Sequence, residues 1–130
     1  KPKVFEVAEI LNLNLYLDKA AKELTADQKQ LISLGRGLVR EDVAAILMDE
    51  PLTVIDPDLK FRLRRKLKEI NEKYKTTLIY VTHDQNEAMT FADNIIVMNE
   101  GKVVDMGTHD ELLKNSKVYK NLYSKQISSS

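Results

Sequence analysis

Cysteine is absent from this chain of 130 residues, which excludes a disulfide framework and thiolate zinc sites and is compatible with a reducing cytoplasm. Long apolar runs are also absent, since none approaches the roughly 20 residues needed to span a bilayer. The opening KPKVFEVAEI is not a signal peptide. Neither sign of charge is in excess, because twenty basic residues balance twenty acidic ones, and no global field favours nucleic acid or an anionic membrane. We expect a soluble chain whose partners are recognised at particular sites.

Length and composition indicate one globular domain. Hydrophobic residues make up 43% of the chain and charged residues 31%. A chain of this length can form one domain with a substantial core, but not two large ones. Because the sequence opens on a lysine that already leads into a helical pattern, we expect a fragment of a longer protein.

Two helices are predicted in the first forty residues. The first is a short amphipathic helix over Val4 to Leu11. The second begins at Thr25, and its apolar face contains Leu31, Leu34 and Leu38. Gly35 and Gly37 lower helix propensity by about 1 kcal/mol each relative to alanine, so we expect them to permit close packing.

Two apolar runs predict the strands of a parallel sheet. AAILM, before Asp49, and LIYVT, before His83, have the length of a strand without alternation, which predicts burial on both faces. A long helix is predicted between them, with an apolar stripe of Leu59, Leu63, Leu67, Ile70 and Tyr74. Two parallel strands joined by a helix require a crossover, so the predicted fold class is α/β.

The remainder of the chain predicts a helix, a hairpin and further helices. The helix covers Gln85 to Ala92, and the hairpin turns at Glu100-Gly101. Thr108 and Glu111 then form a capping box that opens the C-terminal helices. His109 lies inside that box, so we predict a structural role for it.

Polar side chains follow both predicted parallel strands. Asp49 and Glu50 follow the first strand, and His83 and Asp84 follow the second. Because ligands of open α/β sheets bind beyond the carboxyl ends of the strands, we expect these groups at one site. Two carboxylates and an imidazole in such a place can bind a metal ion, activate water and sense an anion.

A magnesium-dependent phosphate reaction suits these residue types. Asp49 would hold the ion through its water shell, because hard oxygen ligands suit magnesium. Glu50 would orient or deprotonate an attacking water, and His83 would donate to a terminal phosphate oxygen. The phosphate cradle itself is missing, since no G-x-x-x-x-G-K-[ST] motif occurs in the chain.

Four segments resemble, in order, the motifs of the ATP-binding subunits of ABC transporters. LTADQKQLISLGRGLVRE resembles the signature segment and its helix, ILMDEP the Walker B strand, LTVIDPDL the D-loop and IYVTHDQNEAMTFAD the switch-histidine region. The resemblance covers most of residues 20–115 and is to the C-terminal half of such a subunit. THDQNEAMTFAD is most similar to importers of sugars and related solutes, whereas the ending VYKNLYSKQ is closer to exporters.

The resemblance implies a fold and a set of roles. The fold would be α/β, part of a P-loop NTPase (RecA-like) parallel sheet with helices, preceded by part of the ABC helical subdomain. Asp49 would be the magnesium carboxylate, Glu50 the catalytic glutamate and His83 the switch histidine. Asp56 would be the D-loop aspartate at the interface of a dimer. Thr25 to Gln28 would face the phosphate of the ATP bound to the opposite subunit.

Domains, partners and location are implied by the same resemblance. Residues 1–40 would be the end of the helical subdomain with the signature helix, 41–110 the C-terminal half of the RecA-like ATPase core, and 111–130 the C-terminal helices. The cofactors would be ATP and Mg²⁺. The partners would be a second ATP-binding subunit and transmembrane permease subunits, without nucleic acid, at the cytoplasmic inner face of the cell membrane. Because the Walker A loop would precede this segment, we expect the chain alone to be inactive.

The signature segment departs from the pattern of the family. The family carries two glycines before the glutamine, whereas Ala26 and Asp27 stand here between Thr25 and Gln28. Glycines let backbone N–H groups at a helix N-terminus approach a phosphate, and a carboxylate works against that approach. Thr25 and Gln28 also have the spacing of a capping box, which is a structural reason for both. We therefore predict a degenerate signature.

Two alternative functions stay open at the level of sequence. The first is the C-terminal lobe of a chromosome-maintenance ABC-type ATPase, which would predict heptads ahead of the signature, whereas residues 1–24 have none. The second is a non-catalytic interaction module derived from an ABC ATPase. In the family, the strand that leads to the Walker A loop lies between the strand ending at His83 and the one beginning near Ile95. We therefore expect a gap or unpaired sheet edges.

Overall fold

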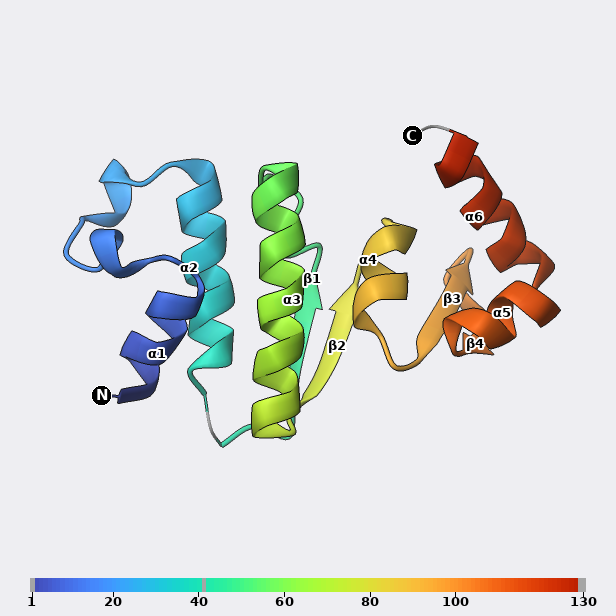
Figure 1. The fold of residues 1–130 in the computed structure, drawn as a ribbon, viewed down its shortest axis with the longest axis horizontal. Helices are drawn as coiled ribbons and strands as arrows, with labels where there is room; N and C mark the ends of the chain where they lie inside the picture. Colours follow the sequence, from blue (N-terminus) through green and yellow to red (C-terminus); the bar gives the residue numbers. More distant parts are fainter. Residues whose placement is uncertain (1, 41, 129–130) are drawn as a thin grey trace. The chain divides into compact units, whose positions relative to one another are not determined.

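The computed structural model describes residues 2–40 and 42–128, and within these ranges it contains six α-helices, two short 3-10 helices and four strands (Figure 1). The chain divides into two compact units, the first ending at Val81 and the second beginning at Thr82. The predicted α/β class is confirmed, because a parallel strand pair is combined with helices.

The first unit begins with two helices that pack against each other. They are α1 (Pro2–Ile10) and α2 (Ala26–Leu38), and the chain between them forms η1 (Asn14–Tyr16) and η2 (Ala21–Glu23). A Cβ atom added to Gly35 of α2 would lie 3.2 Å from Leu11 Cδ1. The close packing predicted at Gly35 is therefore confirmed, since a side chain there would press on the residue that follows α1.

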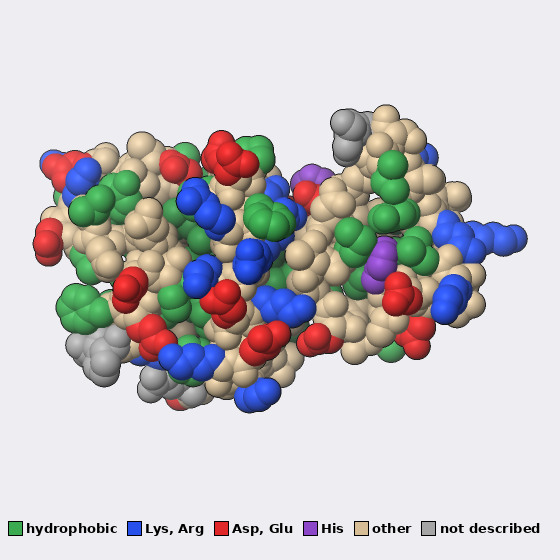
Figure 2. Space-filling view, in the orientation of Figure 1, with side chains coloured by type: hydrophobic (Ala, Val, Ile, Leu, Met, Phe, Trp, Pro, Cys, Tyr) green, Lys and Arg blue, Asp and Glu red, His purple; other side chains and the backbone are tan. Residues whose placement is uncertain are grey.

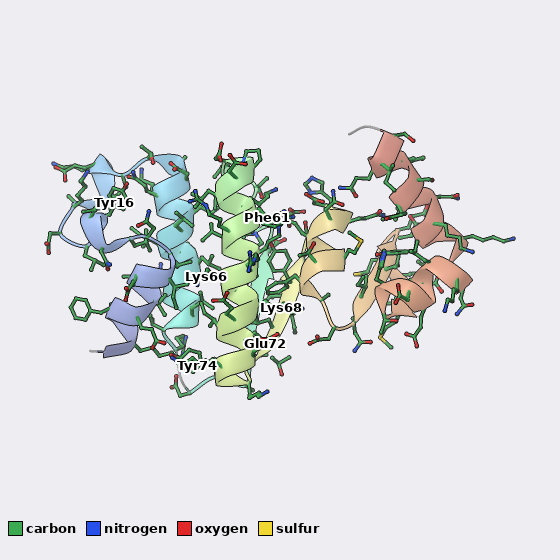
Figure 3. All side chains as sticks on the ribbon, in the orientation of Figure 1. Tyr16, Phe61, Lys66, Lys68, Glu72 and Tyr74 are labelled. Carbon is green, nitrogen blue, oxygen red and sulfur yellow. The ribbon has the colours of Figure 1, made fainter. Side chains whose placement is uncertain are left out.

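Helix α3 (Pro57–Tyr74) is the longest element and has one buried stripe. Asp56 caps its first turn, and Lys75 ends it in the left-handed conformation with φ of 55°. Of the five residues predicted for its apolar stripe, Leu63, Leu67 and Ile70 are buried, whereas Leu59 and Tyr74 are half-buried. The opposite side is exposed and carries Phe61, Lys68 and Glu72 (Figure 3). Basic side chains gather over this helix in Figure 2, because seven of its residues are Lys or Arg and only three are acidic.

Strands β1 (Ala45–Asp49) and β2 (Thr77–Val81) form the parallel pair that α3 connects. The register aligns Ala45 with Thr77 and Asp49 with Val81, so both strands end at the same edge. This is the arrangement that the two apolar runs predict. The carboxyl ends of β1 and β2 are therefore the edge where a ligand of an α/β sheet would bind.

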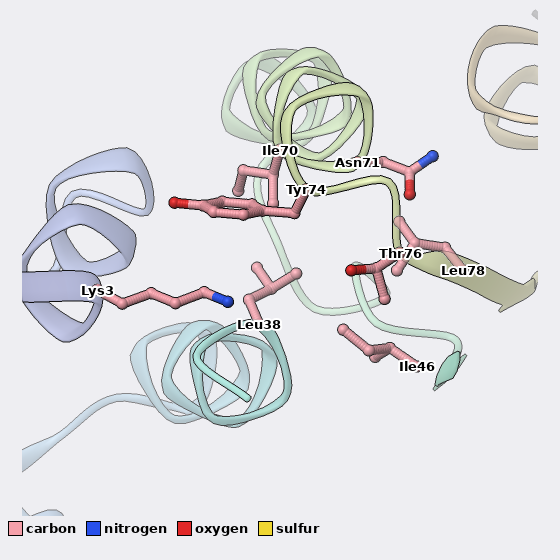
Figure 4. A pocket seen from close by; sticks show the side chains of 8 residues that line it. All are labelled: Lys3, Leu38, Ile46, Ile70, Asn71, Tyr74, Thr76 and Leu78. Carbon is pink, nitrogen blue, oxygen red and sulfur yellow. The ribbon is translucent and has the colours of Figure 1, made fainter. Parts of the chain in front are cut away.

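The prediction that these strands are buried on both faces is wrong. Ile46 and Leu78 lie beside Leu38 of α2 and Ile70 of α3, on the covered face (Figure 4). The alternate residues face the other way: Leu47 is 69% exposed and Ile79 is 51% exposed. Successive strand residues point to opposite faces, and the helices of the first unit cover only one of these faces. The other face presents apolar side chains to solvent.

The second unit is a hairpin with three helices. Its elements are α4 (Gln85–Phe91), β3 (Ile95–Asn99), β4 (Lys102–Gly107), α5 (His109–Asn115) and α6 (Lys117–Ser128). The predicted two-residue turn is confirmed, because Glu100 and Gly101 have φ of 48° and 74°, as the right-handed twist of a hairpin favours. The core of this unit consists of Ile95, Val97, Leu112 and Tyr119.

The four strands form two separate two-stranded sheets, β1 with β2 and β3 with β4. This agrees with the expectation of a gap or unpaired sheet edges. The three-part division at residues 40 and 110 stays a prediction. None of the helices in residues 2–40 and 42–128 has both the length and the apolarity needed to cross a bilayer.

Candidate functional site

Asp49 and Glu50 occupy the carboxyl end of β1. Asp49 is the last residue of the strand and is exposed, whereas Glu50 is half-buried and has a positive φ of 46°. Glu50 N donates to the carbonyl oxygen of Val81 at 2.9 Å, which extends the pairing with β2 by one bond. The hydroxyl of Thr53 donates to the Glu50 carbonyl at 2.6 Å. The backbone that carries the two predicted carboxylates is therefore fixed on two sides.

Gln30 of α2 also holds this turn, and sequence reasoning did not single it out. Its Nε2 donates to the carbonyl oxygen of Glu50 at 3.2 Å, and its Oε1 accepts from Val54 N at 3.2 Å. One amide side chain thus joins the helix of the predicted signature to both ends of the turn after β1. The partners lie 20 and 24 residues away along the chain, so no local pattern indicates them.

The predicted signature segment begins α2, with Thr25 at the N-cap. Gln28 Oε1 accepts from Thr25 N at 3.1 Å, as the capping box predicts. The Thr25 hydroxyl donates to a carboxylate oxygen of Asp27. This hydrogen bond, with backbone N–H donors of the same turn, lowers the pKa of Asp27 below its ordinary value. The helix end that the resemblance assigns to a phosphate therefore carries a stabilised negative charge in its first turn.

Asp56, the predicted D-loop aspartate, has a structural role in this chain. Its Oδ1 accepts from Asp58 N at 3.0 Å and from Leu59 N at 3.3 Å, and Pro57 follows it at the first helical position. This is an N-cap, which satisfies backbone donors that have no partner within the helix. Capping of α3 is thus a sufficient reason for an aspartate at position 56 within a single chain. A role of Asp56 at a dimer interface stays a prediction.

His83 lies in the second unit, in the loop that leads into α4. Its side chain is exposed, and its two neighbours are held by other groups. The Thr82 hydroxyl accepts from Asp84 N at 3.0 Å and donates to Glu87 Oε2 at 2.7 Å. Glu87 is only 2% exposed, so this bond ties the loop to the buried side of α4.

Asp84 and Gln126 join the His83 loop to the C-terminal helix. Asp84 Oδ1 accepts from Asn86 N at 2.8 Å as the N-cap of α4, and it accepts from Gln126 Nε2 at 2.8 Å. Gln126 Oε1 in turn accepts from Gln85 N at 3.0 Å. Gln126 lies outside the four motifs, and the part that Glu87 plays in holding Thr82 was not predicted from its place in the switch-histidine segment.

His109 packs inside the second unit, in agreement with its predicted structural role. Its Nδ1 lies 2.8 Å from the hydroxyl of Tyr119, and its ring stands edge-on to the rings of Tyr119 and Tyr123. Tyr119 is 2% exposed, and burial raises the pKa of its hydroxyl. His109 lies within the capping box of Thr108 and Glu111, and both predicted hydrogen bonds of this box are formed.

The predicted site residues are divided between the two units. Asp49 and Glu50 lie together at the end of β1, and Glu50 is linked by Gln30 to the helix of the predicted signature. His83 lies in a loop of the second unit, two residues after Val81 in sequence. Among the described residues, no three His, Asp or Glu side chains come together as a metal site.

Two hollows of the first unit lie away from these residues. The smaller encloses about 10 Å³ and is lined by Lys3, Leu38, Ile46, Ile70, Asn71, Tyr74, Thr76 and Leu78 (Figure 4). The larger encloses about 200 Å³ and is lined by Glu6, Ile10, Lys66, Glu69, Ile70, Lys73 and Tyr74. Ligand pockets are usually of about 300 Å³ or more. Neither hollow has the size or the residues of a nucleotide site.

Comparison with known proteins shows which proteins have similar sequences and a similar fold. No family model matches the chain. It is 46% identical over 110 residues to an uncharacterised ABC transporter ATP-binding protein of Sinorhizobium fredii, and 44% identical over 108 residues to the oligosaccharides import ATP-binding protein MsmX of Bacillus subtilis. These alignments cover 85% and 83% of the chain and 29% of each relative. The chain is homologous to a portion of an ABC transporter ATP-binding protein.

Further relatives agree with this ABC relationship. The sn-glycerol-3-phosphate import ATP-binding protein UgpC 3 of Rhizobium johnstonii is 47% identical over 106 residues, which is 82% of this chain and 30% of that protein. The chain therefore spans less than a third of the length of these relatives. Among solved structures, a bacterial Atm1-family ABC exporter with ATP bound matches 98% of this chain and 24% of its own, with a TM-score of 0.80 at 17% identity. That match shows that the fold is shared. The resemblance read from the four sequence motifs is confirmed.

Proposed function

We propose that the chain is the Walker B and switch-histidine portion of an ABC transporter ATPase subunit, and that the complete protein couples ATP hydrolysis to solute transport. The placement of Asp49 and Glu50 at the carboxyl end of β1 carries this proposal. It is supported by the relatives, three of which are named as import ATP-binding proteins or ABC transporter ATP-binding proteins at 44–47% identity.

Asp49 fits a magnesium ion as a single hard oxygen ligand. Its carboxylate is exposed at the strand end, and magnesium is usually bound by one or two carboxylates together with waters and substrate phosphates. When bound, the ion would neutralise charge on the phosphates of ATP.

Glu50 and His83 are the proposed catalytic residues. The half-buried Glu50 would orient or deprotonate the attacking water. Its backbone carbonyl accepts from Gln30 and Thr53 and its backbone N–H donates to Val81, and these bonds would limit the movement of the backbone. His83 is exposed on a loop held at both sides, where its imidazole could donate to a terminal phosphate oxygen. These roles rest on the residue types and positions, together with the family resemblance.

The segment Thr25 to Gln28 does not fit a phosphate well. The carboxylate of Asp27 lies in the first turn of α2, where the helix end would otherwise favour an anion, and the hydroxyl of Thr25 stabilises its charged form. We propose that this segment and Asp56 lie at the interface with a second ATP-binding subunit, and that the ATP site completed by this segment is weak.

The partners would be a second ATP-binding subunit and transmembrane permease subunits, with the protein peripheral at the cytoplasmic face of the membrane. The exposed apolar face of the β1–β2 sheet supports an incomplete core, since Leu47 and Ile79 would be covered by further strands or helices of a longer protein. The balanced charge of the chain gives no support for nucleic acid as a partner.

ATPase assays of the whole gene product test this function. We expect it to hydrolyse ATP in the presence of Mg²⁺, and we expect the Glu50→Gln variant to lose at least 100-fold in kcat while still binding ATP. Glu72→Gln, which changes an exposed glutamate of α3, is the matched control and should leave the rate unchanged. We expect no turnover by residues 1–130 alone. ATP hydrolysis by this isolated chain that survives Glu50→Gln would overturn the proposal.

One observation favours a second candidate, a non-catalytic interaction module. Asp27 is a stabilised anion in the segment that would have to meet a phosphate. A protein that has lost ATP hydrolysis could keep such a residue without a penalty in function. In that case the whole gene product would show no ATPase activity, and replacing Ala26 and Asp27 by glycine would not restore it.

A further inference from the structure

We propose that Gln126 of α6 is a positioning residue for His83, and that it holds the loop in which the histidine lies. The proposal rests on the proposed function for the role of His83. Gln126, His83 and the loop residues that join them all belong to the second unit, which is one compact body.

The amide of Gln126 contacts two consecutive residues of the loop. Its Nε2 donates to Asp84 Oδ1 at 2.8 Å, and its Oε1 accepts from Gln85 N at 3.0 Å. The two bonds use opposite ends of one planar group, so they fix the orientation of the side chain as well as its distance. Asp84 and Gln85 lie about 40 residues before Gln126, and the bonds therefore join the C-terminal helix to the start of α4.

The other side of the loop is held by Glu87. Its buried carboxylate accepts from the Thr82 hydroxyl, and the same hydroxyl accepts from Asp84 N. His83 thus stands between two residues that are both held in place, Thr82 by Glu87 of α4 and Asp84 by Gln126. Because Asp84 also caps α4 through Asn86 N, movement of Asp84 would loosen both the loop and the helix that follows it.

Helix α6 is itself anchored well enough to act as a support. Ser116, which is 1% exposed, donates to the Asp105 carboxylate of β4 and accepts from Tyr119 N at 3.0 Å. Tyr119 is buried in the core of the unit, and Gln126 lies seven residues later on the same face of the helix. The position of Gln126 is therefore set by the hairpin and not by the loop alone.

A positioning role predicts a specific kinetic effect. Loss of Gln126 would loosen the loop that carries the imidazole, so that His83 spends a smaller fraction of time in an orientation that can meet a phosphate. We expect Gln126→Ala to lower kcat of the whole gene product about tenfold, with KM for ATP within about threefold of the wild type. Ser124→Ala, two residues earlier and exposed on the same helix, should change neither value.

Hydrogen exchange tests the support directly and does not depend on ATP. In residues 1–130, we expect the Gln85 amide to exchange at least tenfold faster in Gln126→Ala than in the wild type, whereas amides of β3 and β4 keep their rates. Ser124→Ala should leave Gln85 unchanged. Unchanged exchange at Gln85 in Gln126→Ala would overturn the proposal, as would faster exchange spread equally over the whole unit.

A charge substitution separates the proposed contact from general stability. Gln126→Glu places a second carboxylate beside Asp84 Oδ1 and should speed exchange at Gln85, because this oxygen loses its donor from α6. Unchanged exchange at Gln85 in Gln126→Glu would contradict the proposed contact. If the wild-type gene product hydrolyses no ATP, the proposed function fails, while the exchange rates still decide whether Gln126 holds the loop.

Discussion

Gln30 and Glu50 are joined by a hydrogen bond of 3.2 Å, from the side-chain amide of α2 to the carbonyl oxygen of the predicted catalytic glutamate. The same side chain accepts from Val54 N, so it spans the turn between β1 and α3. Gln30→Ala removes both bonds and leaves a half-buried carbonyl with fewer donors. We expect it to lower the free energy of unfolding by about 1–2 kcal/mol.

Urea denaturation of the chain measures this effect. Lys29→Ala is the matched control, because Lys29 precedes Gln30 on the same helix and is exposed. Its effect should stay within about 0.5 kcal/mol. Equal stability of the two variants would mean that the bonds of Gln30 do not hold the turn.

Leu47 and Met48 are adjacent in β1 and lie on opposite faces of the sheet, one 69% exposed and the other 5% exposed. We expect Leu47→Ala to change the free energy of unfolding of this chain by less than about 0.5 kcal/mol. Met48→Ala should lower it by about 2–5 kcal/mol, because it removes buried methylene groups and leaves a cavity. Similar losses for both variants, measured in urea, would indicate that the outer face is covered.

The contrast between these neighbours shows what a single sequence can predict. Local signals located the strand, the turn at Glu100-Gly101 and the caps at Thr25 and Thr108, because each of these depends on residues a few positions apart. Burial of Leu47 depends on whether another element reaches that face of the sheet. An apolar run without alternation indicates only that the side chains on both faces of the strand are suited to burial. In this chain, the helices of the first unit pack on one face of the sheet and leave the other exposed.

The candidate site likewise has a part that the sequence could predict and a part that it could not. Asp49, Glu50 and His83 follow strands and could be identified by position, as sites of α/β proteins often can. The side chains that hold their backbone could not. Gln30 and Gln126 are ordinary helical residues whose partners lie 20 and 42 positions away, and only the packing of the helices brings them to those loops.

Glu6 predicts a dependence of stability on acid pH. Its carboxylate accepts from Lys73 Nζ and from the Tyr74 hydroxyl, and these bonds lower the pKa of Glu6 below its ordinary value of 4.5. The ionised form therefore stabilises the fold at pH above 4.5, and this contribution is lost as the pH falls through the lowered pKa. Glu6→Gln should be less stable than the wild type at neutral pH, and the difference should shrink in acid.

Denaturation between pH 7 and pH 3 checks the contribution of Glu6. Glu9→Gln provides the control, because Glu9 is exposed on the same helix. It should follow the wild-type curve throughout. A constant difference between Glu6→Gln and the wild type at all of these pH values would show that packing, not charge, accounts for the effect.

The first turn of α2 gives the prediction that bears most on function. Two like charges about 4 Å apart at an effective dielectric near 20 repel by roughly 4 kcal/mol before screening, and even a quarter of this changes affinity about fivefold. The carboxylate of Asp27 would act in this way on a phosphate. We expect Ala26→Gly with Asp27→Gly, made in the whole gene product, to raise ATPase activity at least fivefold.

Asp27→Asn separates the charge from the backbone in this experiment. It keeps the side chain and removes the negative charge, so it should recover part of the gain if repulsion is the main obstacle. If ATPase activity rises only with the two glycines, the obstacle is steric, because a Cβ atom keeps a phosphate away from the backbone of the helix end. If neither variant gains activity, the degenerate signature belongs to a protein that no longer uses ATP, and the interaction module becomes the better account of the chain.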